Sequence, residues 1–430
     1  MKIGRTILPV ARFTLLHTAL QGITAVTGIF LVWMLPKSEY ALYALTAQFI
    51  STLAVLSDSG VGASALALAG RRWPDPRAVA SVVVSAVRFR RGLIAAYGVV
   101  LVPIMLWLFA KQETPLYLSI LLIALILLIA FFQLNVNVLG TVPRLSGDFH
   151  EAQRADVVGA ALRMLVLVLL GTALPRFGLN IITVTLAALL GTSVTVASLQ
   201  RSVRRRLDLP EHAAKQDIKE IGELTRSQMA GALFYCVQGQ IAIWIVAVAG
   251  NTTAIADIGA LSRLAVAFNA VTAAMTLIIV PRISKSRTHA ELMKHTGAAF
   301  AIQFTFSCAM LVAAWQFPSA LLLVLGPKYN NLQREVFYIV LVSVLASTIS
   351  TLWLIISSRG WVKHSWINIP LVIAVQIIAA SRMQLTSVKD VLQFNAISTV
   401  PTLLLYSWFL LEGIRRSHRL QTVVAVPVES

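Results

Sequence analysis

Long uninterrupted apolar runs constrain this chain more than any other feature of its sequence. A helix needs roughly 20 apolar residues to cross a hydrocarbon layer about 30 Å thick, and runs of that length recur along the whole chain. Apolar residues make up 57% of the 430 residues and charged residues only 13%, about half of what a soluble domain usually carries. These runs predict an all-α protein that crosses a membrane many times, because a bilayer excludes unpaired backbone.

Twelve such segments predict twelve transmembrane helices. They cover residues 13–35, 40–68, 92–110, 116–139, 157–174, 178–199, 227–249, 253–280, 297–325, 336–357, 366–380 and 391–411. The first run contains polar residues, is long and lacks a small-residue cleavage site, so we predict a membrane helix rather than a signal peptide.

The Lys and Arg residues set an orientation for these helices. All 36 of them except Arg163 and Arg263 fall in the predicted tails and connections, mostly in the two tails and the even-numbered connections. Because short loops rich in Lys and Arg stay on the cytoplasmic side, we predict that both termini are cytoplasmic. The net charge of +18 then reflects topology, and we expect no binding of nucleic acid.

One connection, residues 201–226, is long enough to divide the chain. It is basic at its start and ends in KQDIKEIGELTRS, whose apolar residues follow the spacing of a short surface helix. We predict an N-terminal six-helix lobe (1–200), a cytoplasmic connecting loop (201–226), a C-terminal six-helix lobe (227–414) and a cytoplasmic tail (415–430). The lobes resemble a repeat, because LQG at 20–22 in the first span matches VQG at 237–239 in the seventh.

Polar side chains on several spans indicate a hydrated cavity. Those at helical spacing on the first span are Thr14, His17, Thr18, Gln21 and Thr24, those on the seventh are Gln228, Tyr235 and Gln238, and the fourth span adds Gln133 and Asn137. We interpret these stripes as lining a cavity that binds the substrate. The alternative is that they form hydrogen bonds between helices, as such residues often do in membrane bundles.

Two arginines lie inside predicted spans, where a charged side chain is costly. Arg263 falls near the middle of the eighth span, and Arg163 falls closer to the start of the fifth. Guanidinium groups in both lobes indicate a cationic cavity. The alternative is neutralisation by acidic side chains of neighbouring helices, and the candidate gating or charge partners are Asp58, Asp156 and Asp257.

Motifs for several kinds of chemistry are absent from the sequence. It contains no GxxxxGK[ST] loop, no HExxH and no Cys/His cluster, and its two cysteines fall inside predicted spans. We therefore predict no catalytic residue, metal or cofactor, no disulfide, and no enzymatic activity.

Three stretches of the sequence resemble the Wzx-like polysaccharide flippases of the MOP superfamily. They are LPKSEYALYALTAQFISTLAVLSDSGVGASALALAGR at 35–71, IGALSRLAVAFNAVTAAMTLIIVPRIS at 258–284 and FPSALLLVLGPKYNN at 317–331. In order and spacing they resemble the second span, the eighth span and the segment after the ninth span of that family. The chain departs from the family pattern at Ala41, where Gly is commoner, and at Asp257 and Gly259.

The resemblance implies two six-helix lobes around a central cavity in the bacterial inner membrane. It implies alternating access that moves an oligosaccharide linked to undecaprenyl pyrophosphate from the inner to the outer leaflet. Basic cavity residues would meet the pyrophosphate, and Arg263 occupies a place where such proteins often carry a polar residue. Expected partners are this substrate, membrane lipids, a coupling H⁺ or Na⁺ ion, a polysaccharide polymerase and glycosyltransferases.

Several other classes of membrane protein remain as alternatives. A MATE-type exporter of cations would want a carboxylate in its cavity, and the first span has none. A major-facilitator permease would carry a different second connection than GRRWPDPR, and a lipid II flippase would have two further spans. A membrane glycosyltransferase or polymerase would have a large outer loop, whereas every outer connection predicted here is short. The MATE-type or other ion-coupled exporter is the main alternative.

Overall fold

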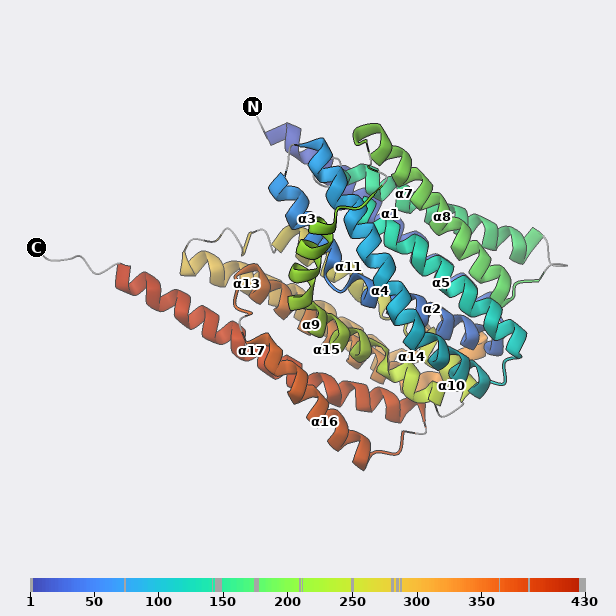
Figure 1. The fold of residues 1–430 in the computed structure, drawn as a ribbon. Helices are drawn as coiled ribbons and strands as arrows, with labels where there is room; N and C mark the ends of the chain where they lie inside the picture. The colour runs from blue at the N-terminus through green and yellow to red at the C-terminus, as the bar shows by residue number, and fades with distance from the viewer. Residues whose placement is uncertain are drawn as a thin grey trace, which may run out of the picture. The chain divides into compact units, whose positions relative to one another are not determined.

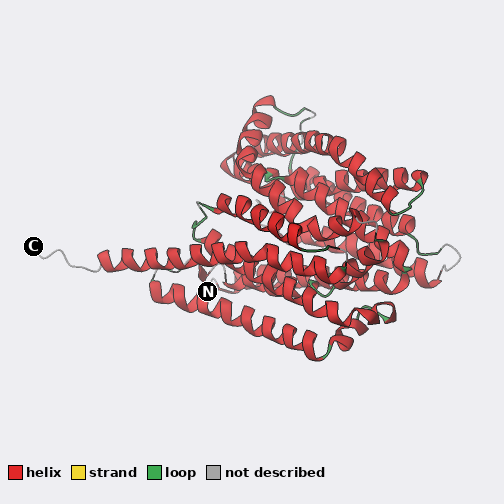
Figure 2. Cartoon of the chain, turned by 90° about the horizontal axis from the view of Figure 1, so that it is seen from below, coloured by secondary structure: helices red, strands yellow, loops and turns green. Residues whose placement is uncertain are grey.

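The structure is a computed structural model of the 430-residue chain. It describes residues 3–72, 75–140, 142–143, 149–173, 178–208, 210, 212–248, 251–279, 282–283, 286, 288–362, 364–385 and 387–424. Within these ranges every regular element is a helix, as Figure 2 shows by colour. This confirms the predicted all-α class.

Backbone contacts divide the chain into two compact units, Met1–Ala256 and Asp257–Ser430 (Figure 1). The first unit contains α1 (Ile3–Met34), α2 (Lys37–Asp58), α3 (Val61–Arg72), α4 (Pro76–Lys111), α5 (Leu116–Leu139), α7 (Phe149–Val168), the π-helix η1 (Leu169–Ala173), α8 (Ile181–Arg206) and α9 (Lys215–Val248). Helix α10 (Thr252–Leu261) runs across the boundary.

The second unit contains the rest of the helices. They are α11 (Val266–Ala274), the π-helix η2 (Met275–Ile279), α13 (His289–Gln316), α14 (Pro318–Leu323), the 3₁₀-helix η3 (Pro327–Leu332), α15 (Gln333–Ser358), the 3₁₀-helix η4 (Ser365–Ile367), α16 (Asn368–Arg382) and α17 (Val388–Val424). Helix α9 packs on α2, α3 and α4 and therefore belongs to the first unit by contact. The predicted lobe boundaries at 1–200 and 227–414 stay a prediction.

Eleven helices among the described residues are long and apolar enough to cross a membrane. In order, they correspond to the first six and the last five predicted spans. The seventh predicted span lies in α9, a continuous helix of 34 residues in which several side chains are not described. The eleventh predicted span corresponds to the shortest of these helices, Ser365–Arg382, at 18 residues. The chain is thus a multi-pass membrane protein.

Local sequence explains where several helices begin. The Asn180 side chain accepts a hydrogen bond of 3.0 Å from the Thr183 N–H, and Thr183 Oγ1 accepts the Asn180 N–H at 3.1 Å, which opens α8 with a capping box. Asp75 caps α4 by accepting the Arg77 N–H at 2.9 Å, and Pro76 is the first helical residue. Helix α4 therefore begins well before residue 92, where the sequence predicted the third span.

Each unit has its own buried apolar core. In the first unit it joins α3, α4 and α9 to the ends of α5, α7 and α8, and in the second it joins η2, α13, α15 and α17. Apolar side chains that recur every three or four residues lie on one face of a helix, and this is the face that packs into the core.

The segment that carries Arg263 is not a regular α-helix. Helix α10 ends at Leu261, and α11 begins only at Val266. The Arg263 N–H donates to the Ala260 carbonyl at 3.0 Å, and similar bonds to the third residue back continue through Phe268. Such bonds tighten the helix into a 3₁₀ turn. The span predicted over 253–280 corresponds to the candidate span Thr252–Ala273, and its helix tightens around Arg263.

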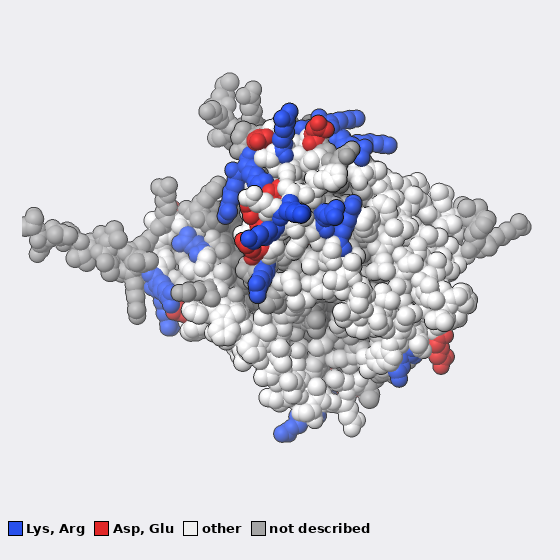
Figure 3. All heavy atoms as spheres, in the orientation of Figure 1, with Lys and Arg blue, Asp and Glu red and all other residues white. Residues whose placement is uncertain are grey.

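Charged side chains are unevenly distributed over the first unit. Figure 3 shows Lys, Arg, Asp and Glu gathered where α3 and α8 end and where α4 and α9 begin, beside a broad uncharged surface. This is the pattern expected of helices that project from a membrane at one end.

Candidate functional site

A cavity of about 470 Å³ lies within the first unit, between α2, α5, α7 and α8. Helices α2, α5 and α8 each contribute one face to it, because their lining residues recur at helical spacing, and α7 contributes Arg163. Its polar lining includes Tyr43, Ser51 and Asp58 from α2, Gln133 and Asn137 from α5, and Arg163 from α7. Volumes of several hundred Å³ are typical of small-molecule sites.

Arg163 gives this cavity a positive charge. Its Nη2 donates to the Tyr43 hydroxyl at 3.4 Å, and its Nε is buried without a hydrogen-bond partner in the described part of the chain. No carboxylate among the described residues forms an ion pair with it. Arg163 is half-buried, and a guanidinium at such a site without a counter-charge favours an anion in the space that it faces.

Two glycines position Arg163 by bringing α7 and α8 close together. A Cβ at Gly159 would lie 2.5 Å from the Gly191 carbonyl oxygen and 2.1 Å from Thr195 Oγ1. A Cβ at Gly191 would lie 3.0 Å from the Arg163 Cβ. Small residues allow such close helix packing in membranes, and here Thr195 adds a hydrogen bond of 3.2 Å to the Ala155 carbonyl.

We expect Gly159→Ala to destabilise the protein by about 1–3 kcal/mol, the usual effect of overpacking, because the added methyl meets backbone that cannot rotate away. The measurement is the midpoint of thermal unfolding in detergent. Gly92→Ala in α4 is the matched control, because nothing lies within 4 Å of the position that its Cβ would take. Equal midpoints for the two variants would contradict the packing role of Gly159.

Asp58 contributes a negative charge that is already compensated. It lies at the end of α2, where its Oδ1 forms an ion pair with Arg90 and accepts the Gly62 N–H at 3.1 Å. Arg90 is fully buried and also donates through Nη1 to the Leu134 carbonyl at 3.2 Å. Because Arg90 neutralises Asp58, the charge left over in the cavity is that of Arg163.

Uncharged polar groups complete the lining of the cavity. Gln133 Oε1 and Thr46 Oγ1 are buried without a hydrogen-bond partner within the described ranges. The hydroxyls of Thr185 and Thr192 donate to carbonyls of their own helix at 2.7 and 2.8 Å, and their oxygens keep accepting capacity. The cavity therefore offers both acceptors and donors around the guanidinium of Arg163.

The structure brings together four of the residues that the sequence indicated, namely Arg163, Gln133, Asn137 and Asp58. His17 and Gln21 on α1 are half-buried, as are Asp156 on α7 and Gln238 on α9, and none of these four lines the cavity. The side chain of Tyr235 lies outside the described residues. Arg263 is half-buried and Asp257 is buried, and both belong to the second unit.

Arg90 is the residue that the sequence interpretation missed. The interpretation counted it among the basic residues of the second connection, whereas the structure buries it as the ion-pair partner of Asp58. A signal was present, because the buried positions Val79, Val83 and Ala86 of α4 continue at the same spacing to Arg90. The sequence offered Asp58 as a charge partner for Arg163 or Arg263, and the structure pairs it with Arg90 instead.

A metal site is not found in the described part of the chain. No group of three or more His, Cys, Asp or Glu side chains lies close enough there to hold an ion. The lining of the cavity includes one carboxylate, that of Asp58, which forms an ion pair with Arg90.

Comparison with known proteins identifies the fold. No protein-family model matches the chain, and no curated protein matches it either. Among solved structures, the chain resembles the inward-facing conformation of a multidrug resistance MATE family transporter of the MOP superfamily, with a TM-score of 0.72 and 17% identity over 94% of this chain and 96% of that one. The chain has the MATE transporter fold.

Two further structures with this fold agree over nearly the whole chain. The outward-facing conformation of a MATE family transporter of the MOP superfamily gives a TM-score of 0.65 at 17% identity, covering 95% of this chain and 96% of that one. MATE in complex with MaL6 gives 0.64 at 17% identity, covering 96% and 97%. The predicted MATE-like arrangement of helices is thereby confirmed.

Proposed function

We propose that this protein is an alternating-access flippase that moves an oligosaccharide linked to undecaprenyl pyrophosphate across the bacterial inner membrane, for the synthesis of a surface polysaccharide. The fold supports a transporter, because the solved structures that it resembles are of transporters. The motifs at 35–71, 258–284 and 317–331 support the polysaccharide branch of this superfamily.

One observation carries the choice of an anionic substrate. The cavity of the first unit contains Arg163, which has no carboxylate partner among the residues described, and an Asp58 whose charge Arg90 compensates. A pyrophosphate would accept charge-assisted hydrogen bonds from this guanidinium. The amide and hydroxyl groups of the lining would face the sugar, and the polyprenyl chain would stay in lipid.

A MATE-type exporter of cations is the second candidate, and the fold favours it as much as it favours a flippase. Such an exporter would need a carboxylate to attract its substrate, and the carboxylate of this cavity is already paired. The expectation that the chain is not an enzyme agrees with the transporters that it resembles. The coupling ion, the polymerase and glycosyltransferase partners, and the cytoplasmic position of both termini are parts of this proposal.

The experiment that separates the two candidates uses the purified protein in liposomes. We expect it to move a fluorescent oligosaccharide on undecaprenyl pyrophosphate between leaflets and not to move the cationic dye ethidium. We propose Arg263 as a second contact of the pyrophosphate, so Arg263→Ala should lower this rate at least tenfold. Arg263→Lys should lower it less, because Lys keeps the charge but loses the planar fork of donors. Transport of ethidium alone would overturn the proposal, and an unchanged rate in Arg263→Ala would remove Arg263 from the site.

A further inference from the structure

A second pocket of about 210 Å³ lies in the first unit at the end where α8 terminates. Three helices line it at helical spacing, with Arg88 and Arg91 from α4, Asn135 from α5, and Gln200 and Arg204 from α8. Its apolar wall consists of Val83, Val84, Val87 and Leu139, and Ala213 closes it from the connector between α8 and α9. Three guanidinium groups therefore surround one small hollow with an apolar wall.

These arginines have no counter-charge in the part of the chain that the structure describes. The pocket is lined by no Asp or Glu, and Arg88, Arg91 and Arg204 form none of the ion pairs found there. Arg91 lies over the Phe131 ring at 5.1 Å, which orients its guanidinium without neutralising it. Arg90, between them in sequence, points elsewhere and pairs with Asp58. Positive charge thus accumulates on one side of α4 only.

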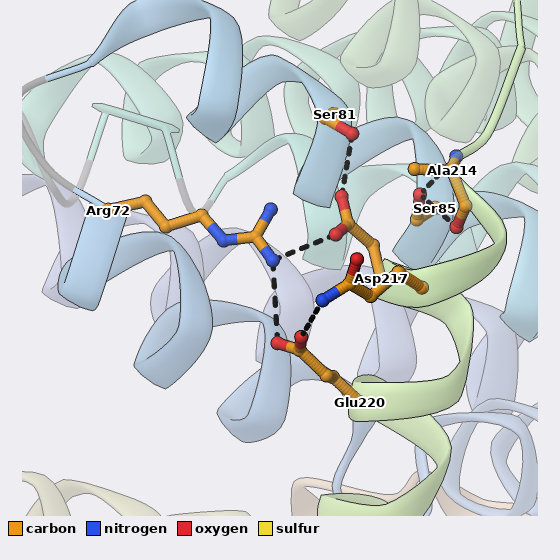
Figure 4. A network of polar contacts seen from close by, with 7 residues as sticks. Arg72, Ser81, Ser85, Ala214, Asp217 and Glu220 are labelled. Atoms are coloured by element: carbon orange, nitrogen blue, oxygen red, sulfur yellow. Dashed lines mark hydrogen bonds and ion pairs between the residues drawn. The ribbon is translucent and has the colours of Figure 1, made fainter.

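A polar network ties the end of the connector and the start of α9 to α3 and α4 (Figure 4). Ser85 Oγ accepts the Ala214 N–H at 3.1 Å, one residue from the lining. Asp217 at the start of α9 is buried, accepts the Ser81 hydroxyl at 2.6 Å and forms an ion pair of 2.8 Å with Arg72. Hydrogen bonding to Asp217 raises the pKa of the Arg72 guanidinium, which therefore stays charged. These contacts anchor the chain directly after Ala213, which lines the pocket.

The position of the pocket along the helices points to a lipid. Arg88 and Arg91 come just before residue 92, where the apolar span of α4 begins, and Arg204 comes just before the end of α8 at Arg206. Leu139 is the last residue of α5. Arginines beside an apolar span suit the level where phospholipid phosphates meet the hydrocarbon layer. Val83, Val84 and Val87 precede Arg88 and Arg91 along α4 and therefore lie on the side away from residue 92.

We propose that this pocket binds the phosphate group of an anionic phospholipid. Guanidinium groups hold phosphate oxygens through charge-assisted and often bidentate hydrogen bonds, and basic pockets between membrane helices on the cytoplasmic side suit anionic headgroups. Arg88, Arg91 and Arg204 bind the phosphate, and Asn135 and Gln200 form hydrogen bonds with other polar oxygens of the lipid. This lipid site is separate from the cavity of Arg163.

The test measures binding of phosphatidylglycerol to the purified full-length protein by native mass spectrometry. The variant Arg88→Gln/Arg91→Gln/Arg204→Gln is expected to lose at least tenfold in affinity. The matched control Arg77→Gln/Arg201→Gln/Arg205→Gln removes the same charge from exposed positions of the same two helices and is expected to stay within twofold of the unchanged protein. Phosphatidylcholine and inorganic phosphate are titrated in parallel, and wild-type protein should bind both at least tenfold more weakly.

Each other result would overturn the proposal. An equal loss in both triple variants would indicate diffuse attraction to the basic surface, which depends on net charge and falls with salt. No loss in either variant would remove the pocket as a site. Binding of inorganic phosphate that depends on the same three arginines, without binding of phosphatidylglycerol, would assign the pocket to free phosphate. Because the readout is binding, none of these results bears on the transport proposal.

Discussion

Replacing Arg163 with Gln is expected to lower transport of the lipid-linked oligosaccharide at least tenfold. The guanidinium is the charge of the cavity that no described carboxylate compensates, so its loss removes the group that would hold the pyrophosphate. Hydrogen bonds to charged groups contribute about 1.5–3 kcal/mol, which corresponds to roughly 10- to 150-fold in binding. The measurement is recovery of surface polysaccharide in a flippase-deficient bacterium, together with the transfer rate in liposomes.

Two further variants make this result specific. Arg163→Lys should recover part of the rate, because it keeps the charge but not the fork of donors. Arg154→Gln removes an exposed arginine from the same helix and should leave transport within twofold of the unchanged protein. Full transport by Arg163→Gln at a normal amount of protein in the membrane would contradict an anion site in this cavity.

The largest effect on stability is expected from Asp58→Asn. It leaves the fully buried guanidinium of Arg90 without its counter-charge. Breaking a buried pair by removing one partner costs about 3–5 kcal/mol, and we expect about 2–3 kcal/mol because the Asp58 side chain is 39% exposed and water reaches it. The midpoint of thermal unfolding of the purified protein in detergent reports this change.

A double variant shows whether the loss comes from the unpaired charge. Asp58→Asn with Arg90→Met removes both charges, and we expect it to recover at least half of the stability that the single variant loses. Asp208→Asn, an exposed carboxylate of the first unit, is the control and should leave the midpoint unchanged. A double variant that is no more stable than Asp58→Asn would show that the pair does not act through its charge.

The membrane spans could be predicted because one physical requirement dominates them. A helix in lipid must be apolar over its whole crossing length, and this can be read along the chain without knowing what lies beside it. Eleven predicted spans therefore correspond to candidate spans of the structure. The interruption around Arg263 escaped prediction, because LSRLA in the middle of an apolar run contains neither Pro nor Gly to end a helix.

The candidate site could be predicted only in part. Arg163 and Asn137 stood out because polar groups inside apolar spans are costly and need a reason. The polar stripe of α1 had the same signal, yet His17 and Gln21 do not line the cavity. Spacing along one helix shows that side chains share a face, but it does not show which neighbour covers that face.

The sequence alone determined that this is an all-α, multi-pass membrane protein, because composition, the length of apolar runs and the distribution of Lys and Arg can be read directly along the chain. The tertiary structure alone decided how its charges pair. Arg90 belongs to a basic stretch and Asp58 lies among small and apolar residues, and only the packing of α4 against α2 lets one neutralise the other. Coulomb interactions act over a few ångströms in space, and distance in space is set by packing rather than by position in the sequence.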